Sequence, residues 1–204
     1  MKELMPEQGW MHLSHVRLSA PAVAERGLLF RSLSGFSRLF GRAEMPDVLT
    51  VLHLNPRLFW AWLFFASRLM PYGRLPATER EKIILRTGWN CRSRYEWGQH
   101  VDIALGAGVT DEEIRCVAEG PAAWSEPRAR ALMLACDEVH RDKCIAEATW
   151  QILAAHYSEK LLIEIVMLIG HYEMIAGFLN SSGIALEPAM EEKLQAFHRR
   201  LGLG

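Results

Sequence analysis

The sequence predicts an all-α protein, because its apolar residues recur at helical spacing and signals for β-strands are nearly absent. Leu, Ala, Glu, Arg and Met recur at intervals of three and four residues. Alternating runs of Val, Ile and Thr between Asn-Gly or Asp-Gly turns are missing. Pro and Gly divide the chain into segments of helical length. We therefore expect helices joined by short connections.

The first part of the chain is predicted to differ from the rest. Residues 1–24 are expected to form an amino-terminal arm, because Pro6, Gly9 and Pro21 interrupt a stretch whose apolar residues lack a helical period. This arm could pack onto a neighbouring subunit. Residues 25–204 are expected to form a single helical domain, which begins with a helix over residues 25–41 and a short helix after Pro46. The next helix should start at Asn55, which can cap it.

Capping signals set the helices of the middle and the end of the chain. Thr78 and Glu81 have the spacing of a capping box and predict a helix over residues 81–88, while Thr110 and Glu113 predict a second box. Other helices are expected over residues 93–105, 126–142, 147–156, 158–180 and 188–201. Ser158 is a natural N-cap. The helix that follows Ser158 is apolar on nearly all sides, so it should be a central buried element of the domain or of a subunit interface.

Composition limits the classes of protein that this chain can be. Its 204 residues suit one domain, and half of them are hydrophobic, which is enough for a sizeable core. A formal net charge of -1 gives no support for binding nucleic acid. The first residues do not resemble a secretory signal, and the apolar runs are short or interrupted by charged residues, so we expect a cytoplasmic protein with no membrane partner. The four cysteines show no C-x-x-C spacing.

Three ionisable residues could carry chemistry. Glu96 and His100 are one helical turn apart, so their side chains share a face and can touch. Glu81 lies on the preceding helix, which a short connection can fold back antiparallel against the helix of Glu96. Two carboxylates and an imidazole in a partly dry pocket form a proton relay, since burial and repulsion favour the neutral acid form of one carboxyl. The alternative is an ordinary helix-surface pair, with Glu81 favoured only by the helix dipole.

Other residues near this segment could also belong to a site. A metal could bind Glu-x-x-x-His with a second Glu, but one histidine is too few, and we expect no metal and no cofactor. Cys91 could be a nucleophile near the start of a helix, or could simply pack. His171 and Tyr172 sit in the apolar helix and could line the same cavity, or could be ordinary core residues. Trp97 could shield a pocket from water or serve only in packing. The aromatic cluster of residues 59–65 is expected in the core or an oligomer interface.

At these residues the chain resembles the carboxymuconolactone decarboxylase-like family, which includes the alkylhydroperoxidase D branch. The resemblance covers residues 55–184, and it rests on the order and spacing of several short motifs rather than on any one of them. These motifs are Leu75-Pro76 with Arg80-Glu81 and Ile84-Leu85-Arg86, then Tyr95-Glu96 with His100, Ala104 and Ala107-Gly108, then Thr110 to Ile114, Ala135 with Asp137-Glu138, Gly170 with Tyr172, and Leu179-Asn180 to Gly183.

The resemblance implies a fold, an assembly and two possible chemistries. The implied fold is an orthogonal helical bundle, assembled into dimers, trimers or hexamers of identical chains. In the alkylhydroperoxidase branch, a Glu, a C-x-x-C pair and a His form a thiol relay that reduces hydroperoxides. Glu81 and His100 match that Glu and His, but Ser93 and Glu96 stand where the two cysteines would be. A serine cannot form a disulfide, so the dithiol cycle is not available at these positions.

The decarboxylase branch needs neither redox cysteines nor a cofactor, and a Glu-x-x-x-His turn is more similar to it. We therefore expect an acid/base enzyme of the lyase type that acts on a small organic acid or lactone through Glu81, Glu96 and His100, with His100 as the proton donor. The runner-up is a hydroperoxide-reducing antioxidant enzyme that uses Cys91 as a lone peroxidatic thiol. A third possibility is a non-catalytic binding or assembly protein.

Overall fold

The computed structural model describes residues 4–22, 30 and 45–203, and within these residues it contains helices and turns but no strand. The all-α fold class is therefore confirmed. In chain order, the helices are α2 (Asp47–Leu52), α3 (Pro56–Leu69), α4 (Ala77–Asn90), α5 (Arg94–Gly106), α6 (Asp111–Glu119), the 3-10 turn η3 (Pro121–Ala123), α7 (Pro127–Asp142), α8 (Glu147–His156), α9 (Glu159–Ser182) and α10 (Pro188–Arg200). The helix predicted over residues 25–41 lies outside the described residues, apart from Phe30, which is helical.

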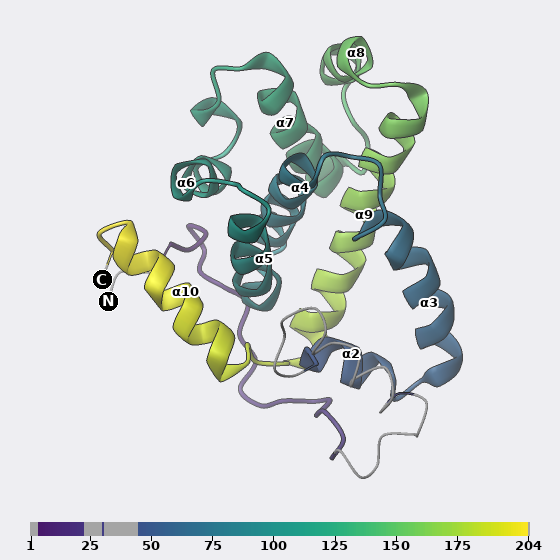
Figure 1. The fold of residues 1–204 in the computed structure, drawn as a ribbon, viewed down its shortest axis with the longest axis vertical. Coiled ribbons are helices and arrows are strands. Elements are labelled where there is room, and N and C mark those ends of the chain that lie inside the picture. The colour runs from purple at the N-terminus through teal and green to yellow at the C-terminus, as the bar shows by residue number, and fades with distance from the viewer. Residues whose placement is uncertain (1–3, 23–29, 31–44, 204) are drawn as a thin grey trace.

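Helices α4 and α9 form the centre of the domain (Figure 1). Helix α4 contacts α5, α6, α7 and α9, and helix α9 also contacts α3, α5, α7 and α8. The main core is built from their buried side chains, among which Ile83, Ile84, Ile165 and Ile169 are completely inaccessible to solvent. Burial of so many aliphatic side chains is the dominant favourable contribution to folding. The long apolar helix is thus a central element, as its sequence predicts.

Most helix ends lie where the sequence places them. The Asn55 side chain accepts a hydrogen bond from the Leu58 backbone at the start of α3, and Thr110 and Glu113 form the predicted capping box at α6. Ser158 occupies the N-cap position of α9, but its side chain makes no capping bond. Each satisfied cap pairs backbone N–H groups that the first helical turn leaves without a partner.

The predicted capping box of Thr78 and Glu81 is wrong. Pro76 occupies the N-cap position of α4 and the helix begins at Ala77, so Thr78 already lies inside the first turn. Glu81 does not turn back to the backbone, because its carboxylate binds two side chains in the interior. Residues with the spacing of a capping box also lie on the same face when both are inside a helix, and this is the arrangement of Thr78 and Glu81.

The described part of the arm packs against its own chain. Arg92 donates through Nε to the carbonyl of Gly9 at 2.6 Å, and the backbone of Met11 donates to the carbonyl of Arg92 at 2.9 Å. The indole of Trp10 lies 5.4 Å from that of Trp89, measured between ring centroids. The arm therefore covers the connection between α4 and α5.

Among the described residues, α9 is the one helix long and apolar enough to cross a membrane by length and composition. One face of α9 packs on α4, with Ile165, Leu168 and Ile169 buried. The opposite face leaves Ile163, Met167 and Met174 exposed. Such a half-buried pattern is also what the core helix of a folded domain produces.

Candidate active site

Helices α4 and α5 bring the three predicted residues together. The two helices run antiparallel and are joined by a short turn at residues 91–93 (Figure 1), in which Ser93 donates its backbone N–H to the carbonyl of Gly88 at 2.8 Å. A Cβ atom at Gly88 would lie only 3.1 Å from the Cβ of Glu96. The absence of a side chain at Gly88 lets the helices approach closely, which sets the position of Glu96 relative to α4.

Glu81 and His100 form a buried hydrogen-bonded pair. Glu81 Oε2 lies 2.8 Å from His100 Nδ1, and Glu81 Oε1 accepts a hydrogen bond of 3.0 Å from Arg80 Nε. The Glu81 side chain is completely buried. A carboxylate facing Nδ1 favours the tautomer that carries its proton there. The Nε2 atom of His100 is then left to act as a proton acceptor.

Glu96 faces the other nitrogen of the same ring. Its Oε2 lies 3.4 Å from His100 Nε2, and both side chains are almost fully buried. The ring of Tyr172 stands edge-on to the imidazole, at 89° and 5.1 Å between centroids. The imidazole is thus held between two carboxyl groups and an aromatic ring, and its contact with Glu96 is the one that the helical spacing predicts.

The environment drives the pKa values of the two carboxyl groups apart. Burial, opposed by the charge of His100 and assisted by the charge of Glu81, raises the pKa of Glu96 to about 7. Burial would also raise the pKa of Glu81, but the hydrogen bond and charge of His100, together with Arg80, outweigh it and hold that pKa below its ordinary value. Near neutral pH, Glu81 is ionised while Glu96 can carry a proton. Such separated carboxyl groups are typical of acid/base sites.

The three residues do not form a metal centre. Glu81 approaches Nδ1 of His100 and Glu96 approaches Nε2, which lie on different edges of the ring. The two carboxylates therefore cannot share a metal ion with a single nitrogen of His100. A metal site requires that all donor atoms point at one position.

A cavity of about 640 Å³ opens beside this cluster. Arg80, Glu96 and His100 line one wall, and Glu187 anchors the neighbouring wall by accepting hydrogen bonds from Tyr95 Oη at 2.6 Å and from Gln99 Nε2 at 2.5 Å. The remaining lining is mainly apolar and comes from the α2 segment, α3 and α9, through Met45, Pro46, Val48, Leu49, Trp62, Leu63, Ala66, Met70, Pro71 and Ile175. A concave, largely apolar space with a few converging polar groups is the usual form of a small-molecule site.

His171 and Tyr172 both line this cavity. The sequence alone does not decide between this position and an ordinary core position for them. Burial lowers the pKa of His171 to about 4, so its ring is neutral at physiological pH. Its Nδ1 atom is buried and lacks a hydrogen-bond partner, and the ring stacks 5.9 Å from that of Trp62. The Tyr172 hydroxyl contacts Met70 Sδ at 3.6 Å rather than a backbone carbonyl. Neither residue is thus a fully satisfied core group.

Three other residues predicted near the pocket are not among its lining side chains. Trp97 is completely buried and packs against Trp89, at 4.9 Å between ring centroids. Ser93 is buried beneath the turn, and its hydroxyl has no hydrogen-bond partner. Cys91 lies outside the cavity, next to residues of α7 and α9. The adjacency of these residues to Glu96 in sequence is misleading, because successive helical residues point in different directions.

The sequence does not predict the apolar lining of the cavity. Trp62 belongs to the aromatic cluster that is expected in the core or an interface, whereas in the structure it lines the cavity. Apolar residues that line a cavity have the same spacing as apolar residues in a core, so the sequence carries no signal that separates them.

Comparisons with known proteins agree with this fold. The model of the carboxymuconolactone decarboxylase family matches residues 56–138, a range that includes Glu81, Glu96 and His100. No curated protein gives a significant match to the sequence.

Several solved structures share the fold. An AhpD-core, peroxidase-related protein from Ralstonia eutropha JMP134 aligns with a TM-score of 0.76 at 20% identity, over 86% of this chain and 94% of that one. A peroxidase-related protein from Silicibacter sp. TM1040 aligns with a TM-score of 0.78 at 13% identity, over 90% of this chain and 97% of that one. A Cys-to-Ala variant of the debrominase Bmp8, in complex with 2,3,4-tribromopyrrole, aligns with a TM-score of 0.75 at 16% identity, over 90% and 98% of the two chains.

The family match covers the two helices that carry the cluster, and the shared fold extends over most of the chain on either side of them. Residues 56–138 of this chain match the carboxymuconolactone decarboxylase family, and the fold of the chain is that of AhpD-like proteins of known structure.

Proposed function

We propose that this protein is a cofactor-independent acid/base enzyme that carries out lyase-type chemistry on a small organic acid or lactone. One observation carries the proposal: two buried carboxyl groups with opposite pKa shifts flank a single imidazole at the wall of a large cavity. Pairs of titratable groups whose environments separate their pKa values are the usual acid and base of such sites.

Each residue has a distinct role in this proposal. Glu81 stays ionised and holds the His100 ring through Nδ1, so that Nε2 faces Glu96 and the cavity. When a substrate loses carbon dioxide, the electron pair of the broken C–C bond remains on carbon or is delocalised into an enolate. The protonated Glu96 then delivers a proton to that site, directly or through Nε2 of His100, and water restores the proton of Glu96 afterwards. Positioned proton transfer of this kind contributes about 10²–10⁴-fold to a rate.

The cavity favours a substrate with an apolar ring and an anionic group. Its lining is mainly aliphatic and aromatic, and its volume lies within the range of small-molecule sites. Arg80 is the cationic side chain in the lining, and beyond its bond to Glu81 it has no other hydrogen-bond partner in the described part of the chain. The remaining N–H groups of its guanidinium can therefore bind a carboxylate of the substrate. The ring-sized ligand bound by the debrominase of similar fold supports a substrate of this size.

The thiol-based alternative has less support. A peroxidatic cysteine acts as a thiolate, so its pKa should be low. Burial and the charge of Glu173 instead raise the pKa of Cys91 to about 12. Ser93 and Glu96 offer no resolving thiol beside it.

The proposal is tested by comparing the wild-type protein with the Glu96→Gln variant on a panel of candidate substrates. Purified protein is incubated with lactones and cyclic carboxylic acids, and substrate loss and carbon dioxide release are followed across pH. We expect activity of the wild-type protein to fall as pH rises through about 7, because the protonated form of Glu96 is lost there. Glu96→Gln keeps the size of the side chain but cannot donate this proton, so activity should fall about 10²-fold or more.

Glu119→Gln is the matched control, because Glu119 is an exposed residue on α6 paired with Arg115. It should leave turnover unchanged. Full activity of Glu96→Gln on every compound that the wild-type protein converts would refute the proposed role. Absence of any turnover, together with ligand binding in the cavity, would favour a non-catalytic binding protein.

A further inference from the structure

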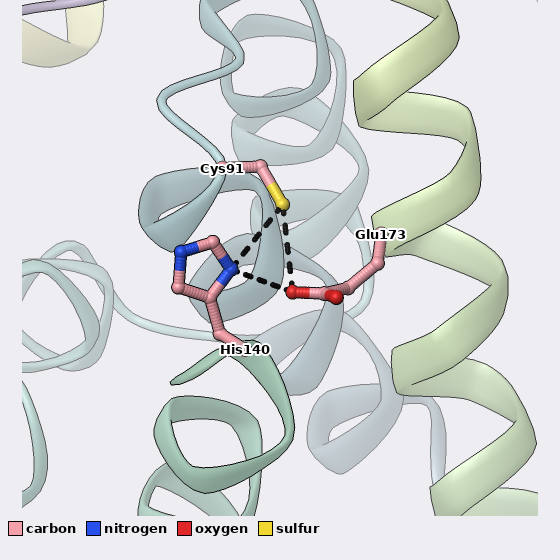
Figure 2. Close-up of side chains that lie close together, drawn as sticks. All are labelled: Cys91, His140 and Glu173. Carbon is pink, nitrogen blue, oxygen red and sulfur yellow. Dashed lines mark hydrogen bonds and ion pairs between the residues drawn. The ribbon is translucent and has the colours of Figure 1, made fainter. Parts of the chain in front are cut away.

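A second cluster of side chains lies at the other end of α4, outside the cavity. Cys91 at the end of α4, His140 on α7 and Glu173 on α9 converge there, and Figure 2 shows the three side chains pointing toward one another. Cys91 Sγ lies 3.8 Å from His140 Nδ1 and 3.8 Å from Glu173 Oε1, while His140 Nδ1 lies 2.6 Å from Glu173 Oε1. Three segments far apart in sequence thus contribute one donor atom each.

This geometry differs from that of a nucleophilic triad. In such a triad the histidine uses one ring nitrogen for the nucleophile and the other for the carboxylate. Here the same atom, His140 Nδ1, faces both Cys91 and Glu173, and the other ring nitrogen points away from the cluster (Figure 2). The ring cannot pass a proton from the thiol to the carboxylate. All three donor atoms instead surround a single position, which is the arrangement of metal ligands.

We propose that Cys91, His140 and Glu173 bind one zinc ion, with water completing a tetrahedral site. A thiolate, an imidazole nitrogen and a carboxylate are ligands that zinc accepts. Zinc–ligand bonds of usual length place tetrahedral ligand atoms about 3.4–3.6 Å apart. The two distances from Cys91 need to shorten only slightly, and the contact between His140 and Glu173 needs to open by less than 1 Å by this estimate. These adjustments are within the reach of side-chain rotation.

The protons and charges of the site can be balanced. Cys91 loses its thiol proton to solvent when zinc binds. The His140 proton moves from Nδ1 to Nε2, where it can hydrogen-bond to water because the His140 side chain is half-exposed. A thiolate and a carboxylate then neutralise the divalent charge. Lys143 Nζ binds Glu173 Oε2 at 2.7 Å and leaves Oε1 to the metal, although its positive charge weakens the attraction for a cation.

The site would join parts of the chain that position the candidate active site. Cys91 lies in the turn that leads into α5, the helix of Glu96 and His100. The side chain of Asn180 donates to the carbonyl of Cys91 at 2.8 Å, which already ties this turn to α9. A zinc ion would add a link to α7 and stabilise the turn, since a ligand that binds only the folded state raises its stability.

Zinc binding by the full-length protein tests this inference. Metal-free protein is titrated with Zn²⁺ by calorimetry, and Co²⁺ replaces zinc as a spectroscopic probe. We expect one ion per chain, a thiolate-to-cobalt charge-transfer band and the intense visible bands of tetrahedral cobalt. Cys91→Ser, His140→Gln and Glu173→Gln should each weaken Zn²⁺ binding by about 100-fold or more, because loss of even an outer-shell partner costs 10–100-fold. Circular dichroism verifies that each variant is folded.

Two further variants test whether zinc binds at this cluster and not elsewhere on the protein. Cys144→Ser alters an exposed cysteine outside the cluster and should leave affinity unchanged. Lys143→Gln removes the adjacent positive charge and should tighten binding. Zinc binding that survives both Cys91→Ser and His140→Gln would overturn the inference, as would the absence of a thiolate–cobalt band in the wild-type protein.

Discussion

Replacement of His100 by Asn is expected to lower turnover by about 10²–10⁴-fold, which is the usual contribution of a general acid or base. Asn can still donate a hydrogen bond to Glu81, so the buried carboxylate keeps a partner near the position of Nδ1. It cannot accept or release a proton as an imidazole does. The change should therefore remove proton transfer while leaving most of the local structure in place. Rates of substrate loss and of carbon dioxide release, measured on a compound converted by the wild-type protein, give the value.

His156→Asn is the control for this experiment, because His156 lies at the exposed end of α8, away from the cavity. It should turn over substrate at the wild-type rate. If His100→Asn retained more than half of the wild-type activity, His100 would not be the group that transfers the proton.

Glu81→Ala should be the most destabilising change in the cluster, with a loss of about 3–5 kcal/mol of unfolding free energy. The variant leaves the Arg80 guanidinium and the His100 imidazole buried without the carboxylate that binds both. Removal of one member of a buried ion pair is costly because the remaining charge has no partner and little water. Urea denaturation at neutral pH measures the difference.

The direction of the pKa shift of Glu81 determines how the stability loss in Glu81→Ala depends on pH. The pKa of Glu81 is lowered in the folded protein, so its stabilisation is present above the pKa of the unfolded chain and is lost as pH falls. The difference between wild-type protein and Glu81→Ala should therefore shrink in acid. Glu119→Ala breaks only an exposed pair with Arg115 and should cost at most about 1 kcal/mol. A similarly small loss for Glu81→Ala would contradict a buried role for this carboxylate.

The sequence predicts most of the helices because apolar periodicity and caps are local signals. Asn55 and Thr110 cap the helices that follow them, and the long apolar helix is central. Thr78 and Glu81 show the limit of such signals, because a capping box and a shared helix face have the same spacing. Contacts with another helix decided which of the two formed.

The candidate site could be predicted only where its residues are close in sequence. Glu96 and His100 are one turn apart, and Glu81 is reached through a short turn, so helix geometry alone brings them together. His140 and Glu173 come from helices far from Cys91, and no spacing in the chain indicates that they meet. The distances between distant elements depend on the packing of the entire core, which a local pattern does not encode.

The titration of the Glu96 carboxyl group tests the central claim most directly. Carbon-13 NMR of protein labelled at the glutamate carboxyl carbons follows each group across pH, and the spectrum of Glu96→Gln identifies the signal of Glu96. Separated carboxyl pKa values predict a midpoint for Glu96 near 7, well above that of an exposed glutamate. A midpoint near the ordinary value of 4.5 would show that Glu96 is ionised throughout the neutral range and cannot supply the proton.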